Sequence, residues 1–128
     1  MSYVIDTDIA IDYLKGKADV VEAVESFPGF LITSITAAEL FYGAYKSDYP
    51  EKNEDRVIKF LGSLTILDVD FYASRLFGKI KADLKRKGKM VGDFDLLIAG
   101  TCIIQECTLI TRNMRHYKDI TGLRVESI

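Results

Sequence analysis

Short apolar runs alternate with longer amphipathic runs along the whole of this chain of 128 residues. The short runs are rich in β-branched and aromatic residues and predict strands at 3–6, 30–33, 65–69, 108–111 and about 124–126. The longer runs repeat apolar residues at helical spacing and predict helices at about 9–14, 18–27, 36–46, 50–61, 71–87 and 93–106, with a short turn of helix near 116. Strands that alternate with helices indicate an α/β fold in which a mostly parallel sheet of four to five strands is covered on both faces.

No linker, repeat or low-complexity tract divides the pattern, so we expect residues 1–128 to form a single domain. The chain is 48% hydrophobic and 28% charged, a composition that favours a folded core over disorder. The longest apolar stretch, 96–104, is shorter than the roughly 20 residues of a membrane span. Residues 1–14 contain no Lys or Arg, unlike a secretory signal. We therefore expect a cytoplasmic protein without a membrane partner.

Several classes of chemistry are disfavoured by what the chain contains. One histidine, His116, is present, without a nucleophile motif to accompany it, which argues against acyl transfer. The nine glycines form neither of the usual phosphate-binding loops, so no nucleotide cofactor is expected. Cys102 and Cys107 are interpreted as reduced, packed thiols.

Oxygen-bearing side chains follow the predicted strands at the points where a parallel sheet gathers its active site. These residues are Asp6, Glu39, Asp93, Asp95 and Asn113. Clustered carboxylates repel one another in a partly buried cleft unless a cation neutralises them. Carboxylate and amide oxygens without Cys or His suit Mg²⁺ or Mn²⁺, which would activate water for attack on a phosphate ester.

Four motifs in this order and spacing resemble the PIN-domain ribonucleases, and within them the VapC-type toxins of toxin–antitoxin systems. The motifs are Val4-Ile5-Asp6-Thr7, Thr36-Ala37-Ala38-Glu39-Leu40 with Gly43, Val91 to Ala99 with Asp93 and Asp95, and Leu109-Ile110-Thr111-Arg112-Asn113. The resemblance covers nearly the whole chain. It implies a three-layer α/β/α fold, Mg²⁺ or Mn²⁺, endonucleolytic cleavage of RNA, a small antitoxin protein as partner, and a homodimer.

The resemblance places the catalytic set on Asp6, Glu39, Asp95 and Asn113. It places metal ligation on Asp6 and Asp95, with Asp93 as an auxiliary carboxylate. Asn113 stands where many members have Asp, so a second metal would be held more weakly here. Asp8 stands where relatives often have a neutral residue. Arg112, Arg115 and the Thr111 hydroxyl are the expected substrate contacts.

Each acidic residue also has a purely structural interpretation. Asp6 can cap the helix that follows it, and Thr36 with Glu39 has the spacing of a capping box. Asp93 and Asp95 fall at a helix start, where the helix dipole favours carboxylates. Gly43 lies one turn beyond Glu39 in a predicted helix, where glycine costs about 1 kcal/mol relative to Ala, so we expect a close approach at that position.

Two other functions remain open at this point. A PIN-like module with faded chemistry would bind RNA or a protein without cutting, as the uncharged Asn113 allows. A Mg²⁺-dependent phosphatase or phospho-acceptor domain on a similar sheet would act on small phosphate esters and ignore RNA.

Overall fold

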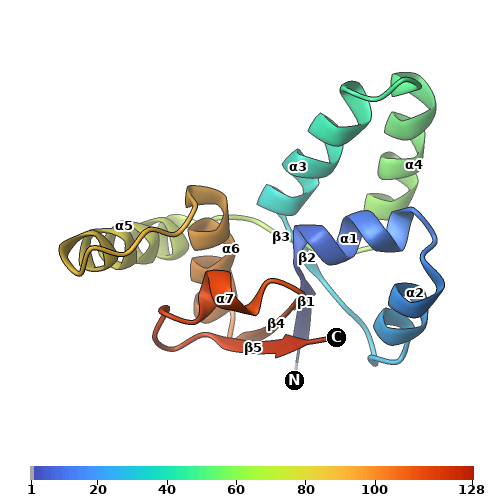
Figure 1. The fold of residues 1–128 in the computed structure, drawn as a ribbon. Coiled ribbons are helices and arrows are strands. Elements are labelled where there is room, and N and C mark those ends of the chain that lie inside the picture. The colour runs from blue at the N-terminus through green and yellow to red at the C-terminus, as the bar shows by residue number, and fades with distance from the viewer. Residues whose placement is uncertain (1) are drawn as a thin grey trace.

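A parallel sheet lies between two layers of helices in the computed structural model, which describes residues 2–128 (Figure 1). The elements are β1 (Ser2–Ile5), α1 (Thr7–Leu14), α2 (Ala18–Glu25), β2 (Ile32–Thr33), α3 (Ser34–Tyr45), α4 (Pro50–Gly62), β3 (Ile66–Leu67), α5 (Phe71–Arg86), α6 (Asp93–Ile104), β4 (Cys107–Thr111), α7 (Met114–Tyr117) and β5 (Arg124–Ser127). No helix within this described range is long and apolar enough to cross a bilayer.

The sheet consists of a three-stranded part, β1-β4-β5, and a two-stranded part, β2-β3. All of their strand pairs are parallel. A parallel bridge between Val4 and Leu31 joins the two parts, with the Ile5 amide donating to the Leu31 carbonyl at 3.1 Å. The predicted α/β fold with a parallel sheet of four to five strands is therefore confirmed.

Neighbouring residues of a central strand point to opposite faces, as the period of two requires. In β1, Val4 packs on the side of α5 and α6 whereas Ile5 packs on the side of α1 to α4. Leu109 and Ile110 in β4 divide in the same way. All four side chains are fully buried, so both strands lie between two apolar layers, which explains their nearly continuous apolar sequences.

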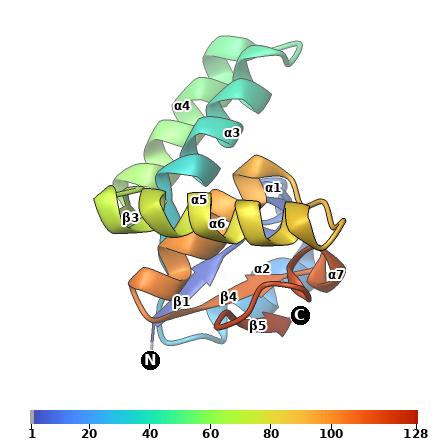
Figure 2. The same ribbon diagram turned by 90° about the vertical axis from the view of Figure 1, so that its left-hand side faces the viewer.

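Two helical projections flank one end of the sheet. The α3–α4 hairpin extends away from it on one side, and α5 crosses α6 on the other (Figures 1 and 2). Gly100 permits the α5–α6 packing, because a Cβ at this position would lie 3.2 Å from the Ala73 carbonyl oxygen. The carboxyl ends of β1 and β4 open between these projections (Figure 1).

The structure corrects two local interpretations of the sequence. The residue that caps α3 is Thr33, whose hydroxyl accepts from the Thr36 amide at 3.2 Å. The capping box expected for Thr36 and Glu39 is therefore wrong. No close approach occurs at Gly43, since a Cβ there would meet nothing within 4 Å. A capping box therefore does not explain Glu39, and a close approach does not explain Gly43.

Candidate active site

Asp6 lies at the carboxyl end of β1 and is almost fully buried, with 4% of its surface exposed. Its amide donates to the Ile110 carbonyl at 2.8 Å, which extends the β1–β4 ladder to the end of the strand. The Thr7 amide donates to Asp6 Oδ1 at 2.9 Å, and the Thr111 hydroxyl donates to Oδ2 at 2.8 Å. Asp6 therefore caps α1, as one interpretation predicted, and is also held by the adjacent strand.

Asp95 is linked to Asp6 through a buried tyrosine. The Tyr117 hydroxyl lies 2.9 Å from Asp6 Oδ2 and 3.2 Å from Asp95 Oδ1. Asp95 projects from the first turn of α6, and its Oδ2 lies 3.1 Å from Nδ1 of His116. These contacts bring together two carboxylates that are 89 positions apart in the numbered sequence.

Glu39 joins the same group from α3. The Thr7 hydroxyl donates to Glu39 Oε1 at 2.8 Å, while the Thr7 amide holds Asp6. Thr36, one turn before Glu39, places its hydroxyl 3.0 Å from the Thr7 hydroxyl. A continuous chain of hydrogen bonds therefore runs from Glu39 through Thr7, Asp6 and Tyr117 to Asp95.

Burial controls the electrostatics of this group. Desolvation raises the pKa of Asp6 from 3.8 to about 6, and the charge of Asp8 adds to the rise, although the Thr111, Tyr117 and Thr7 hydrogen bonds oppose it. Burial also raises the pKa of Tyr117, and the nearby charges of Asp6 and Asp95 raise it further, so its phenol stays protonated at neutral pH. A buried carboxylate with a raised pKa beside a second carboxylate is the setting that a bound cation would stabilise.

Asn113 is linked by hydrogen bonds to two neighbours of Asp6 in the site, Asp8 and Thr111. Its Nδ2 donates to Asp8 Oδ2 at 3.1 Å, and its amide donates to the Thr111 hydroxyl at 3.0 Å. The Arg112 amide also donates to Asp8 Oδ2 at 3.1 Å. Asp8 is partly buried, and this burial raises the pKa of its carboxyl. Its hydrogen bonds to Arg112 and Asn113 hold the loop after β4.

The other predicted site residues are placed differently. The Asp93 carboxylate forms an exposed ion pair with Lys81 at 2.7 Å. Arg112 forms ion pairs with Asp12 at 3.2 Å and Asp19 at 3.0 Å.

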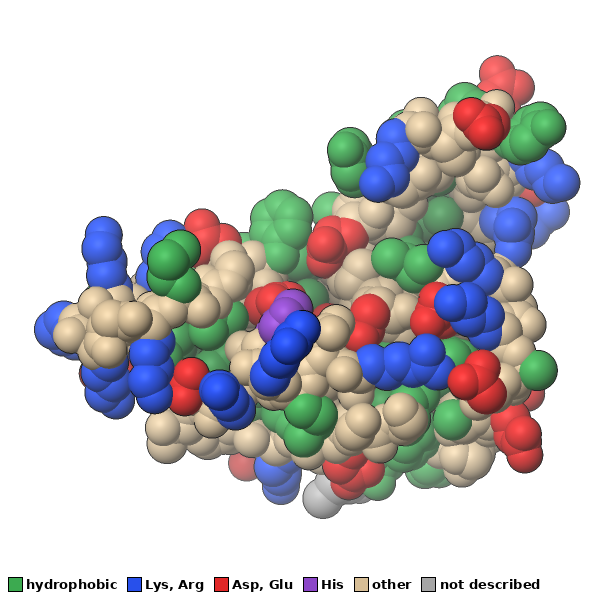
Figure 3. Space-filling view, viewed as in Figure 1, with side chains coloured by type: hydrophobic (Ala, Val, Ile, Leu, Met, Phe, Trp, Pro, Cys, Tyr) green, Lys and Arg blue, Asp and Glu red, His purple; other side chains and the backbone are tan. Residues whose placement is uncertain are grey.

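Arg115, in contrast, lies in the hollow that contains Asp95 and His116. Figure 3 shows acidic side chains gathered around the histidine, with Lys and Arg side chains clustered over the far end of α5.

The donor chemistry fits a hard divalent ion, because Asp6, Asp95 and Glu39 offer carboxylate oxygens. In addition, Asp6 is buried, and this burial raises the pKa of its carboxyl. Within residues 2–128, however, no three His, Cys, Asp or Glu side chains already lie in a metal-binding arrangement. The convergence of four oxygen donors on one ion therefore stays a prediction, because the side chains of this range do not already form a metal cage. Thr7 holds Glu39 and Lys81 holds Asp93, which leaves Asp6 and Asp95 as the central pair.

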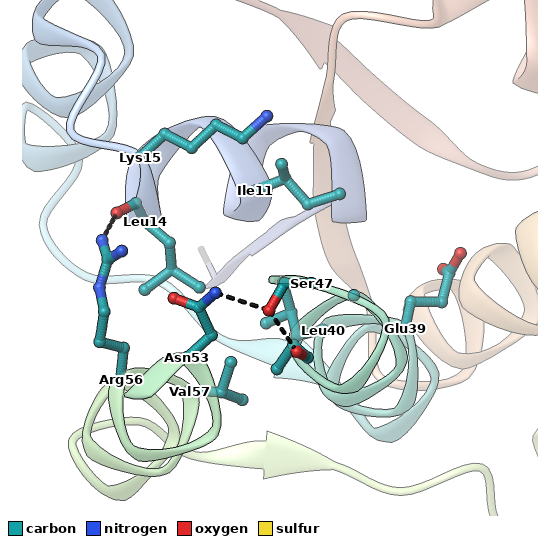
Figure 4. A pocket seen from close by; sticks show the side chains of 11 residues that line it. Ile11, Leu14, Lys15, Glu39, Leu40, Ser47, Asn53, Arg56 and Val57 are labelled. Carbon is teal, nitrogen blue, oxygen red and sulfur yellow. Dashed lines mark hydrogen bonds between the residues drawn. The ribbon is translucent and has the colours of Figure 1, made fainter. Parts of the chain in front are cut away.

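A pocket adjoins this group on the side of Glu39 (Figure 4). It lies between α1, α3 and α4, and its lining combines apolar residues with Lys15 and Arg56. Arg56 donates to the Leu14 carbonyl, and Asn53 donates to the Ser47 hydroxyl at 2.8 Å across the α3–α4 turn. Gly43 also lines the pocket, so its missing side chain leaves this space open.

Sequence reasoning missed Thr7 and Tyr117, and it gave His116 no role at the site. A buried Tyr hydroxyl needs a polar partner, and Tyr117 follows the strand that ends at Thr111, so its involvement had a detectable signal. Thr7 had none, since a threonine after a capping Asp is ordinary at a helix start.

Comparison with known proteins places this architecture in a family. The PIN domain family model matches residues 3–121. Ribonuclease VapC2 of Haemophilus influenzae is 36% identical over 129 residues, covering 99% of this chain and 98% of that protein. The tRNA(fMet)-specific endonuclease VapC of Shigella flexneri is 38% identical over 128 residues, covering 98% of this chain and 97% of that protein.

Solved structures agree with the sequence relatives. The crystal structure of DNA-bound VapBC from Salmonella typhimurium superposes with a TM-score of 0.90 at 36% identity, covering 99% of this chain and 98% of that one. VapBC2 from Rickettsia felis, bound to a DNA fragment from its promoter, gives a TM-score of 0.88 at 32% identity, covering 100% and 99% of the two chains. This chain therefore belongs to the PIN-domain family, and within it to the VapC-type ribonucleases.

Proposed function

We propose that this chain is a metal-dependent endoribonuclease that hydrolyses RNA phosphodiester bonds and acts as the toxin of a toxin–antitoxin pair. The observation that carries the proposal is the buried Asp6 carboxylate, linked to Asp95 through Tyr117 and to Glu39 through Thr7. The full-length similarity to VapC ribonucleases supports the same reaction class.

Asp6 and Asp95 are the residues we assign to holding Mg²⁺ or Mn²⁺, which when bound supplies an acidic water and neutralises charge on the phosphate. The chain's own groups orient these ligands. Thr111 and the Thr7 amide fix the two oxygens of Asp6. Glu39, turned toward Asp6 by the Thr7 hydroxyl, is placed to accept a proton from the attacking water.

Asn113 acts on the site through the loop that carries it. It has no formal charge; its side-chain amide holds Asp8 and its backbone amide holds the Thr111 hydroxyl. We therefore assign it to positioning Thr111. Asp93 keeps only an auxiliary role, since Lys81 already neutralises it.

RNA reaches the site through the hollow beside Asp95 and His116, where Arg115 provides a cation for a phosphate. Arg112 contributes less directly, because Asp12 and Asp19 already hold its guanidinium. Relatives named as tRNA(fMet)-specific endonucleases support a tRNA as the substrate of this chain. A cytoplasmic location is consistent with an RNA substrate and with the two free, buried cysteines.

The antitoxin partner is supported by solved VapBC complexes with similar toxins. We assign its docking to the pocket beside Glu39, because its apolar lining from α1, α3 and α4 would take an apolar side chain of the partner. Gly43→Gln tests the assignment, since its side chain would enter the open pocket, with Gly43→Ala as the matched control. We expect binding of the cognate antitoxin to weaken for Gly43→Gln alone. Equal affinity of both variants would place the antitoxin elsewhere.

A homodimer, expected from the family, is tested by the mass of the free toxin in solution.

Cleavage of purified tRNAs and of an unrelated structured RNA, with Mg²⁺ or Mn²⁺ and with EDTA, tests the activity. We expect one or a few tRNAs to be cut at single positions, and we expect EDTA and Asp6→Asn each to abolish cutting. Cutting that survives both treatments would refute the proposal. RNA binding without cutting would instead favour a binding module, and hydrolysis of small phosphate esters alone would favour a phosphatase.

A further inference from the structure

We propose that Tyr117 is a positioning residue that sets the separation of Asp6 and Asp95 and thereby the affinity of the site for a divalent ion. The inference rests on the proposed function, because it concerns the ion that the two carboxylates would hold. It assigns a role to a hydroxyl that is not itself a ligand.

The hydroxyl of Tyr117 lies between the two carboxylates. It is 2.9 Å from Asp6 Oδ2 and 3.2 Å from Asp95 Oδ1, and the residue is only 2% exposed. A phenol has one proton to donate, so the two carboxylates share it, with the shorter contact to Asp6. The shared proton reduces the repulsion that would otherwise push two neighbouring carboxylates apart.

Packing fixes the place of this hydroxyl. The Tyr117 ring belongs to the apolar cluster on the α5–α6 face of the sheet, together with Leu109 of β4 and Ile120. The ring therefore cannot move away from the site without disturbing the core. Its oxygen reaches the end of β1 from a rigid anchor, as an outer group that orients metal ligands must.

Neither carboxylate needs Tyr117 merely to satisfy its hydrogen bonding. Asp6 also accepts from the Thr7 amide and the Thr111 hydroxyl, and Asp95 has His116 at 3.1 Å. A phenylalanine would fill the same space in the core. What the hydroxyl provides is a direct link between the two carboxylates, because the same oxygen contacts both Asp6 and Asp95.

Calorimetric titration of Mn²⁺ into the full chain tests the inference with Tyr117→Phe. We expect the variant to bind Mn²⁺ about 10-fold more weakly, the lower end of the effect of removing an outer-shell partner of a ligand. Tyr13→Phe is the matched control, because the Tyr13 hydroxyl contacts Glu25 at 3.2 Å, away from the site, and its removal leaves Mn²⁺ affinity unchanged. In RNA cleavage, saturating Mn²⁺ should restore the rate of Tyr117→Phe.

The outcomes separate this inference from the proposed function. Wild-type affinity in a folded Tyr117→Phe variant would overturn the inference and leave the nuclease proposal intact. Absence of Mn²⁺ binding by the wild-type chain would overturn both. If Tyr117→Phe does not fold, titration of ¹³C-tyrosine-labelled wild type with Mg²⁺ decides: a buried tyrosine signal should shift as the ion binds, and a spectrum unmoved at saturation would refute the role.

Discussion

The Thr111 hydroxyl donates a 2.8 Å hydrogen bond to Asp6 Oδ2 across 105 positions of sequence. The parallel register of β1 and β4 explains the contact. Ile5 is paired with Ile110, so the residues that follow them, Asp6 and Thr111, lie side by side at the end of the β1–β4 ladder. The strand register therefore determines both the position of this carboxylate and the donor that stabilises its charge.

Thr111→Val should weaken metal binding at neutral pH. Loss of the hydroxyl removes a hydrogen bond that lowers the pKa of Asp6, so the pKa rises further and the carboxylate competes less well for a cation. We expect Mn²⁺ affinity at pH 7 to fall about 10-fold, with recovery at higher pH. Calorimetric titration of Mn²⁺ at several pH values measures this change in affinity.

The matched control is Thr101→Val, which also removes a buried hydroxyl, here one that donates to the Leu97 carbonyl at 2.8 Å within α6. Equal losses of Mn²⁺ affinity in the two variants would attribute the effect to general destabilisation of the fold rather than to Asp6.

Asp6 should make the metal-free protein less stable as the pH rises. Its pKa is about 6 in the folded chain against 3.8 for the unfolded reference, so the folded state binds the proton more tightly. The resulting contribution is fully present below 3.8 and is lost as the pH rises through 6. At 1.36 kcal/mol for each unit of pKa difference, the loss is about 3 kcal/mol.

Urea unfolding in EDTA at pH 4, 6 and 8 measures this effect against Asp6→Asn. The variant lacks the titrating carboxyl, so its free energy of unfolding should fall less than that of the wild type over this range. Parallel pH profiles for the two proteins would show that Asp6 does not titrate as its burial requires. Adding Mn²⁺ at pH 8 should restore stability to the wild type alone, because a bound ion favours the ionised carboxylate.

Glu39→Gln should abolish cleavage without disturbing the fold. The amide oxygen of Gln still accepts from Thr7, and Glu39 is only partly buried, so the free energy of unfolding should change little. Loss of the proton acceptor should lower kcat by about 10²- to 10⁴-fold. Single-turnover cleavage of the tRNA substrate measures it. A drop in Mn²⁺ affinity as large as the drop in kcat would instead make Glu39 a metal ligand.

Much of the fold is predictable because local rules and long-range packing agree. Pro50 begins α4 as its fixed backbone favours, and the predicted helix at 71–87 is observed as Phe71–Arg86. The strands β2 and β3 are shorter than predicted. Their ladder consists of Ile32–Thr33 paired with Ile66–Leu67. The apolar residues beside them, Phe30, Leu31 and Leu64, are partly buried against the core clusters, and the hydrophobic pattern does not distinguish such packing from strand pairing.

The site was less predictable, because it depends on side-chain partners rather than on strand ends. The rule for parallel sheets located Asp6, whereas Thr111, which donates to it, was expected only as a substrate contact. It could not show that Thr33 rather than Thr36 caps α3, which frees Glu39 to meet Thr7. Nor could it show that a tyrosine anchored in the core would link Asp6 to Asp95.

Asp93 and Asp95 provide the sharpest comparison, since both lie in the first turn of α6 but Asp95 contacts Tyr117 and His116 whereas Asp93 pairs with Lys81. The Asp93 side chain is 56% exposed and paired with Lys81, which is 49% exposed, and such surface pairs contribute roughly 0–1 kcal/mol. Asp93→Asn should therefore leave Mn²⁺ affinity and cleavage nearly unchanged. Asp95→Asn removes a proposed ligand, so we expect it to lose several kcal/mol of transition-state stabilisation. The cleavage rate should then fall by on the order of 100-fold or more. Assaying both variants side by side decides the assignment: a comparable loss in Asp93→Asn would mean that the Lys81 pair opens when the ion binds and that both carboxylates of this turn are ligands.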